Sequence, residues 1–168
     1  MTDSIWALAG LGLFVLGIVF VVLRRAKVIV PRRTYPQYVV KSCSGLPANG
    51  RLVIEVDAVG PFPASATLTP YFQRAGDDWS ARGEYEAYRW WASFATIKLV
   101  PGQHRIEVSF ADNWTAVLRS SRQTNPDAFA EALKKAARVG FTIGDSTGLG
   151  HGDNPKGAIS DYRIIVLD

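Results

Sequence analysis

The sequence predicts a mainly β protein: an antiparallel jelly-roll sandwich with one short helix, preceded by a single transmembrane α-helix. Three observations predict this fold. An uncharged apolar run fills positions 5–23, short apolar segments separated by turn residues follow from position 38, and one amphipathic stretch interrupts them near position 130. We therefore divide the chain into an N-terminal tail (1–4), a transmembrane helix (5–23), a basic juxtamembrane linker (24–37) and a β-sandwich domain (38–168).

The apolar run from Ile5 to Leu23 contains no charge, polar residue or proline. In a helix it would span roughly 28 Å, which matches the hydrocarbon core of a bilayer. A basic collar follows it, composed of Arg24, Arg25, Lys27, Arg32 and Arg33. A cleaved signal peptide is the alternative, but residues 1–4 lack Lys and Arg, and no small-x-small cleavage site follows the run. We expect a retained anchor in contact with membrane lipid.

The charge distribution bears on the side of the membrane and on the class of partner. Because Lys and Arg are retained in the cytoplasm, the collar places the domain on the cytoplasmic side of a bacterial inner membrane. Five of the 19 Lys and Arg lie in the collar and one of the 15 Asp and Glu precedes it, so the rest of the chain is neutral. A neutral domain offers no basic stripe to a phosphate backbone, which argues against a nucleic-acid partner.

Short apolar segments with turn residues between them predict the strands of the sandwich. The clearest alternation of apolar and polar residues is at 104–110, as in a half-buried strand, and Pro101-Gly102 before it is a turn sequence. The expected strands cover 38–40, 52–57, 66–72, 84–94, 95–100, 104–110, 139–143 and 162–167. Such a series of antiparallel strands is typical of a sandwich, and a jelly roll is the usual form for eight.

One helix is expected after Asn125, which is a suitable N-cap and is followed by Pro126 at the first helical position. Its apolar stripe consists of Phe129, Ala132, Leu133, Ala136 and Ala137. Lys134, Lys135 and Arg138 would complement the helix dipole at the C-terminal end. Gly140 is expected to end the helix, which would cover one end of the sheet core.

Catalytic signals are sparse, and we predict neither an enzyme nor a cofactor. The sequence contains two histidines and has no nucleophile elbow, zinc motif or phosphate-binding loop. A glycan lyase or hydrolase is a distant alternative, whose carboxylates would come from Glu84, Glu86 and Asp112. The residues of the Gly-rich segment 144–153 that could ligate a cation are Asp145, His151 and Asp153. Their scattered spacing in one loop does not predict a metal site.

A cluster of aromatic residues with interleaved arginines gives the better indication of function. It consists of Trp79, Arg82, Tyr85, Tyr88, Arg89, Trp90 and Trp91, with Trp114 later in the chain. Aromatic faces flanked by polar groups stack on sugar rings, and Trp, Tyr and Arg also dominate the energetics of protein interfaces. Since neighbouring side chains of a strand point to opposite faces, at least one of Trp90 and Trp91 is expected to pack inward.

The order and spacing of several motifs show a resemblance to known proteins. The motifs are Trp91-Ala92-Ser93-Phe94, Leu99-Val100-Pro101-Gly102, Asp112-Asn113-Trp114, Val139-Gly140-Phe141-Thr142-Ile143-Gly144 and Gly148-Leu149-Gly150-His151-Gly152. Residues 84–168 resemble a group of uncharacterised small bacterial β-sandwich proteins. The fold of that group is similar to the galactose-binding-like jelly rolls, which include carbohydrate-binding modules and the complex I intermediate-associated domain. The resemblance implies a fold and carries over no functional residue.

We therefore expect a non-catalytic, membrane-anchored binding module, with two alternatives for what it binds. In the first, it is an accessory or assembly subunit of a larger membrane complex. Gly10, Gly12 and Gly17 would then let another transmembrane helix approach closely. In the second, it is a carbohydrate-binding module, and the domain would face the periplasm.

Overall fold

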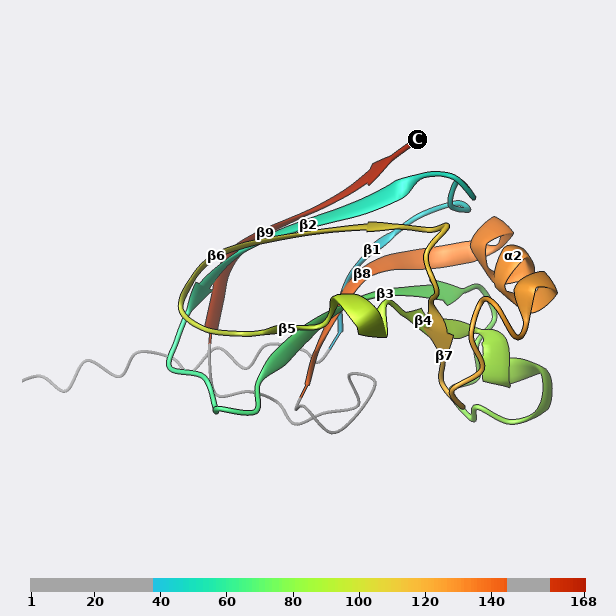
Figure 1. Ribbon diagram of the computed structural model, residues 1–168, viewed down its shortest axis with the longest axis horizontal. Helices are drawn as coiled ribbons and strands as arrows, with labels where there is room; N and C mark the ends of the chain where they lie inside the picture. Colours follow the sequence, from blue (N-terminus) through green and yellow to red (C-terminus); the bar gives the residue numbers. More distant parts are fainter. Residues whose placement is uncertain (1–37, 145–157) are drawn as a thin grey trace, which may run out of the picture. The chain divides into compact units, whose positions relative to one another are not determined.

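Two antiparallel sheets form a β-sandwich in the computed structural model, which describes residues 38–144 and 158–168 (Figure 1). The six-stranded sheet has the order β1 (Tyr38–Ser42), β8 (Ala136–Gly144), β3 (Thr67–Arg74), β4 (Arg89–Trp91) and β7 (Thr115–Ala116), with β5 (Ile97–Lys98) paired to β3. The three-stranded sheet has the order β6 (Gly102–Ser109), β2 (Arg51–Val59) and β9 (Ala158–Leu167). The predicted mainly β, antiparallel architecture with one helix is therefore confirmed.

The core lies between the sheets and follows the alternation of the strands. In β2 the inward side chains are those of Leu52, Ile54, Val56 and Ala58, and β6 contributes Ile106 and Val108 opposite them. Aromatic rings from the other sheet and from the connections fill the space between these strands. Phe72 packs edge-to-face against three of them, the rings of Phe110, Trp114 and Phe129. The centre of the outer face of the six-stranded sheet is also shielded from solvent, because Tyr71, Trp91 and Thr142 on that face are fully buried.

The segment 84–94, expected to be one strand, is broken into three elements. A 3-10 helix, η1 (Gly83–Ala87), precedes the three residues of β4, and a second, η2 (Ser93–Ala95), follows them. The N–H of Tyr85 donates to the carbonyl of Arg82, and the N–H of Tyr88 donates to that of Tyr85, so local turns replace ladder bonds before β4. The two-residue strand β7, absent from the predicted set, pairs with the outer edge of β4.

The helix α2 (Pro126–Lys134) begins at the predicted residue and ends earlier than Gly140. The prediction that Ala136 and Ala137 extend its apolar stripe is wrong, as is the placement of Arg138 at its C-terminal end, because all three residues belong to β8. The carbonyls of Ala136 and Ala137 accept hydrogen bonds from the N–H groups of Gly45 and Cys43. These non-local bonds replace a further turn of helix. Asn125 occupies the N-cap position without a side-chain capping bond.

The predicted transmembrane helix (5–23) and basic collar (24–33) lie outside the described residues. Within 38–144 and 158–168, no helix is both long and apolar enough to cross a membrane.

We expect Gly140→Ala to destabilise the domain more than Gly76→Ala does. A Cβ at position 140 would overlap the backbone of β1 at the carbonyl oxygen of Val39. A Cβ at position 76 meets nothing within 4 Å, and only its positive φ of 81° opposes the change. Urea unfolding should show a loss of about 3 kcal/mol for Gly140→Ala and about 1 kcal/mol for Gly76→Ala. Equal losses would contradict the close approach of β1 and β8.

Candidate functional site

The predicted aromatic cluster is divided between the core and the outer face of the six-stranded sheet. Trp90 and Trp114 belong to the core and are fully buried. The indole N–H of Trp90 donates to the carbonyl of Ala87 at 2.8 Å, and that of Trp114 to the carbonyl of Ser109 at 2.8 Å. Trp91 points to the opposite face of β4 and is also fully buried. Burial leaves these three indoles no surface for a ligand in this conformation.

Trp91 is part of an aromatic row on the outer face of the six-stranded sheet. The ring of Tyr71 lies 5.0 Å from that of Trp91 and 5.2 Å from that of Tyr38. The row ends at Trp79, whose ring lies 5.4 Å from that of Tyr38. Burial raises the pKa of Tyr38 and of Tyr71, so both hydroxyls stay protonated. Only Trp79 presents much surface to solvent, with 46% of the residue exposed.

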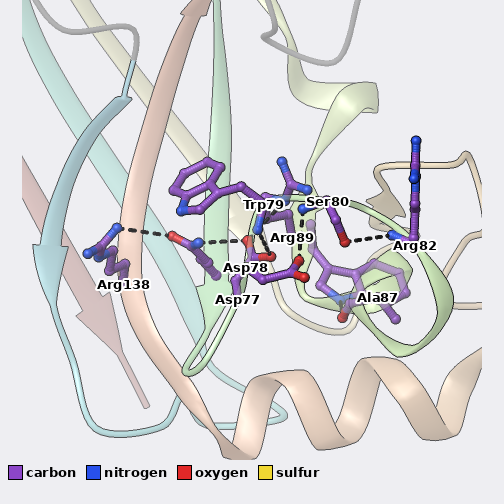
Figure 2. A network of polar contacts seen from close by, with 10 residues as sticks. Asp77, Asp78, Trp79, Ser80, Arg82, Ala87, Arg89 and Arg138 are labelled. Carbon is purple, nitrogen blue, oxygen red and sulfur yellow. Dashed lines mark hydrogen bonds and ion pairs between the residues drawn. The ribbon is translucent and has the colours of Figure 1, made fainter.

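Trp79 is held by a buried ion pair between Arg89 and Asp77 (Figure 2). Arg89 Nε lies 3.0 Å from Asp77 Oδ2, and the two side chains are 4% and 1% exposed. Asp77 Oδ2 also accepts a 2.7 Å bond from the amide of Gln73, and Asp77 Oδ1 accepts a 2.9 Å bond from the backbone N–H of Trp79. The guanidinium carbon of Arg89 lies 5.0 Å from the centre of the Trp79 ring. The pair therefore positions both the backbone and the ring of Trp79.

The backbone after Asp77 is strained. Trp79, Ala81 and Gly83 all have positive φ values, of 67°, 54° and 58°, although only the last is a glycine. Side-chain oxygens bridge the turns: Asp78 accepts the N–H of Ser80 at 2.8 Å, and the hydroxyl of Ser80 accepts a further backbone N–H. The bonds from Ser80 lower the pKa of Asp78. A surface tryptophan is thus kept in a costly conformation by its surroundings.

The other members of the predicted cluster lie apart from Trp79. Tyr88 is nearly buried, with its ring 4.9 Å from that of Tyr85 and 4.3 Å from the guanidinium carbon of Arg74. Its hydroxyl donates to Glu84 at 3.1 Å. Figure 2 shows the exposed side chain of Arg82 directed away from the Asp77–Arg89 pair. Of the predicted cluster, the structure therefore brings together Trp79, Arg89 and Trp91 on one face.

The carboxylates proposed for a hydrolase have local roles or face solvent. Glu84 accepts the Tyr88 hydroxyl, Asp112 accepts the N–H of Ser109 at 3.0 Å and so closes a turn, and Glu86 is exposed. The candidate cation ligands Asp145, His151 and Asp153 lie outside the described residues. Among the side chains that the structure does describe, no group of three or more His, Cys, Asp or Glu is placed to hold a metal ion.

The outer face of the three-stranded sheet carries a hollow that the sequence did not predict. It has a volume of about 370 Å³. The outward side chains that line it are Glu55, Asp57, Gln103, Arg105, Asp161 and Arg163. Charged or amide residues at alternate positions of three paired strands were the available signal, but the pairing of β9 with β2 was not apparent from the sequence.

Ion pairs occupy one half of this hollow and leave the other half open. Glu55 binds Arg105 at 2.9 Å and Arg163 at 2.8 Å. Asp57 and Asp161 face each other across the strands, and Asp57 accepts the hydroxyl of Ser160 at 3.1 Å. Each of these two carboxylates therefore keeps oxygen lone pairs that can accept hydrogen bonds from a ligand.

In comparisons with known proteins, no family model, no curated protein and no solved structure matches this chain.

We expect Asp77→Asn to destabilise the domain much more than Asp78→Asn does. Removing the charge of Asp77 leaves the guanidinium of Arg89 buried without an ionic partner, a change that typically costs about 3 kcal/mol. Asp78 is exposed and its bonds come from nearby Ser80, which an asparagine oxygen can also accept, so it is a matched control. Urea unfolding measures both changes. If both variants unfold as the wild type does, the ion pair is not a determinant of the loop.

Proposed function

We propose that this chain is a non-catalytic, membrane-anchored binding module that serves as an accessory or assembly subunit of a larger membrane protein complex. The observation that carries the proposal is the exposed ring of Trp79, fixed above the buried Arg89–Asp77 pair in a strained backbone. Strain at a surface aromatic residue is a reason to infer a function for it. The anchor is the apolar run 5–23, and the collar favours a cytoplasmic domain.

The fixed position of Trp79 favours a protein partner. Interface hot spots are enriched in Trp and Arg, and a side chain ordered before binding loses less entropy when the complex forms. About half of Trp79 is exposed, and its ring contacts Tyr38 and Arg89 within the domain. A partner with an apolar recess could therefore cover the ring without displacing the domain's own contacts.

The strand order also supports the finer fold assignment, a jelly roll of the galactose-binding type. The pairs β2 with β9, β3 with β8 and β4 with β7 are nested, and the first lies in a different sheet from the other two. Nested antiparallel pairs divided between two sheets are expected when a long hairpin rolls up into a sandwich. The resemblance of residues 84–168 to small bacterial β-sandwich proteins points to the same fold.

Carbohydrate binding is the second candidate, and the hollow on the three-stranded sheet favours it. Carboxylate, amide and guanidinium groups gather there from three strands, and these groups bond to neighbouring hydroxyls of a sugar. The aromatic cluster, in contrast, gives this candidate little support, because Trp90, Trp91 and Trp114 are buried. A carbohydrate-binding domain would face the periplasm.

The subunit proposal predicts that Trp79→Ala removes the chain from its complex and that Phe94→Ala does not. Both aromatic residues are about half exposed, so both variants should fold. Loss of a central aromatic anchor typically lowers affinity about 30-fold or more. Native gels of membranes solubilised in mild detergent should show the wild type and Phe94→Ala in one larger species and Trp79→Ala as the free chain. A wild-type chain that migrates alone would contradict the proposal.

The carbohydrate candidate predicts that Asp57→Asn and Asp161→Asn each weaken retention on immobilised glycans by about tenfold, because each removes a charged hydrogen-bond acceptor. Asp127→Asn, in the first turn of α2, is the control. A phosphatase fused after Asp168 should then be active, since the domain must face the periplasm. Retention that is insensitive to both hollow variants would exclude this site.

A further inference from the structure

One end of the sandwich, which we call the tip, consists of residues 59–63 and 100–101. Val59 and Val100 are 44% and 46% exposed, and Pro61, Pro63 and Pro101 are exposed as well. No charged residue occurs from position 58 to 66 or from 99 to 102. Single exposed apolar residues are ordinary, but an uncharged apolar surface built from two neighbouring loops marks a contact site.

The two loops of the tip are held together by close packing. A Cβ at Gly60 would lie 2.7 Å from Pro101 Cγ and 3.3 Å from the ring of Phe62, so the loops touch at this glycine. Behind them, the N–H of Leu99 donates to the carbonyl of Ala66 at 2.9 Å. The tip is therefore a fixed surface of the sandwich.

Strand register places the tip at the end where the chain enters the domain. β1 begins at Tyr38, which pairs with Thr142 near the end of β8, and the last residue of β8, Gly144, pairs with the first residue of β3, Thr67. The turn from β2 to β3, which contains residues 60–63, therefore lies at the same end as Tyr38. Figure 1 shows α2 at the opposite end of the sandwich.

We propose that the tip inserts into the surface of the lipid bilayer that holds the anchor; this inference rests on the anchorage in the proposed function. Residues 24–37 join the apolar run to β1, and a chain of that length reaches at most about 50 Å. Because β1 begins at the same end of the sandwich as the tip, a bilayer that holds the anchor is present there at high effective concentration. The charged residues that flank the tip in the sequence, Asp57 and Lys98, have opposite signs, so apolar contact and not attraction to anionic lipid drives the insertion.

The test uses the full chain in vesicles of neutral phosphatidylcholine. In a Cys43→Ala background, an environment-sensitive dye is attached to Val100→Cys or, as the control, to Leu118→Cys. Leu118 is 57% exposed and lies between β7 and α2, away from the tip. We expect the dye at position 100 to brighten severalfold and to be quenched at least twofold by lipids with a spin label in the acyl chain. The dye at position 118 should show neither change, and replacing neutral with anionic lipid should alter neither result.

Further measurements separate the ways in which the proposal can fail. Flotation of the vesicles tests the anchor: if the chain does not float with them, the anchorage and this inference both fail. If it floats but positions 100 and 118 respond alike, the tip proposal fails alone. Shielding of position 100 in native membranes but not in pure lipid would show that a protein covers the tip, and this too overturns the proposal. Val59→Asp should abolish the quenching at position 100, and circular dichroism of each variant checks that the fold is retained.

Discussion

The buried ion pair between Arg89 and Asp77 is the interaction on which the outer face of the six-stranded sheet depends. Taking two charges out of water is costly, and further hydrogen bonds to either charge offset part of that cost. Here the amide of Gln73 and the backbone N–H of Trp79 both bond to Asp77. The second of these bonds belongs to a residue with positive φ, so the ion pair and the strained turn support each other. Arg89 lies against the Trp79 ring, and the Trp79 ring contacts that of Tyr38. Tyr38 in turn contacts the buried ring of Tyr71, which packs against Trp91.

This arrangement explains why the two sheets differ in the character of their outer faces. The outer face of the three-stranded sheet carries paired charges such as Glu55 and Arg163, which need no cover because water solvates them. The outer face of the six-stranded sheet carries Tyr71, Trp91 and Thr142, all fully buried. The central strands of this sheet are buried on both faces over most of their length, since β3 and β8 each contain six consecutive buried residues.

The sequence predicted the features that local signals determine and misplaced those that depend on distant parts of the chain. The alternation at 104–110 located β6, and Asn125-Pro126 located the start of α2, because both signals are local. The end of α2 was misplaced because the bonds from Gly45 and Cys43 that draw Ala136 and Ala137 into β8 come from a distant part of the chain. For the same reason, aromatic content alone could not separate Trp79 from Trp90. Their environments are set by the ion pair at Asp77 and by packing against Phe129, neither of which has a sequence pattern.

The two proposed contacts are geometrically compatible in one molecule. The tip lies at the end of the sandwich where β1 begins, whereas Trp79 lies against Tyr38 and Arg89 over the outer face of the six-stranded sheet. Insertion of Val59 and Val100 into lipid would fix the tilt of the domain and leave that face directed along the membrane. A partner anchored in the same bilayer would then approach Trp79 in two dimensions, with less orientational freedom to lose on binding. A weak apolar contact at the tip would in this way strengthen the protein contact without touching it.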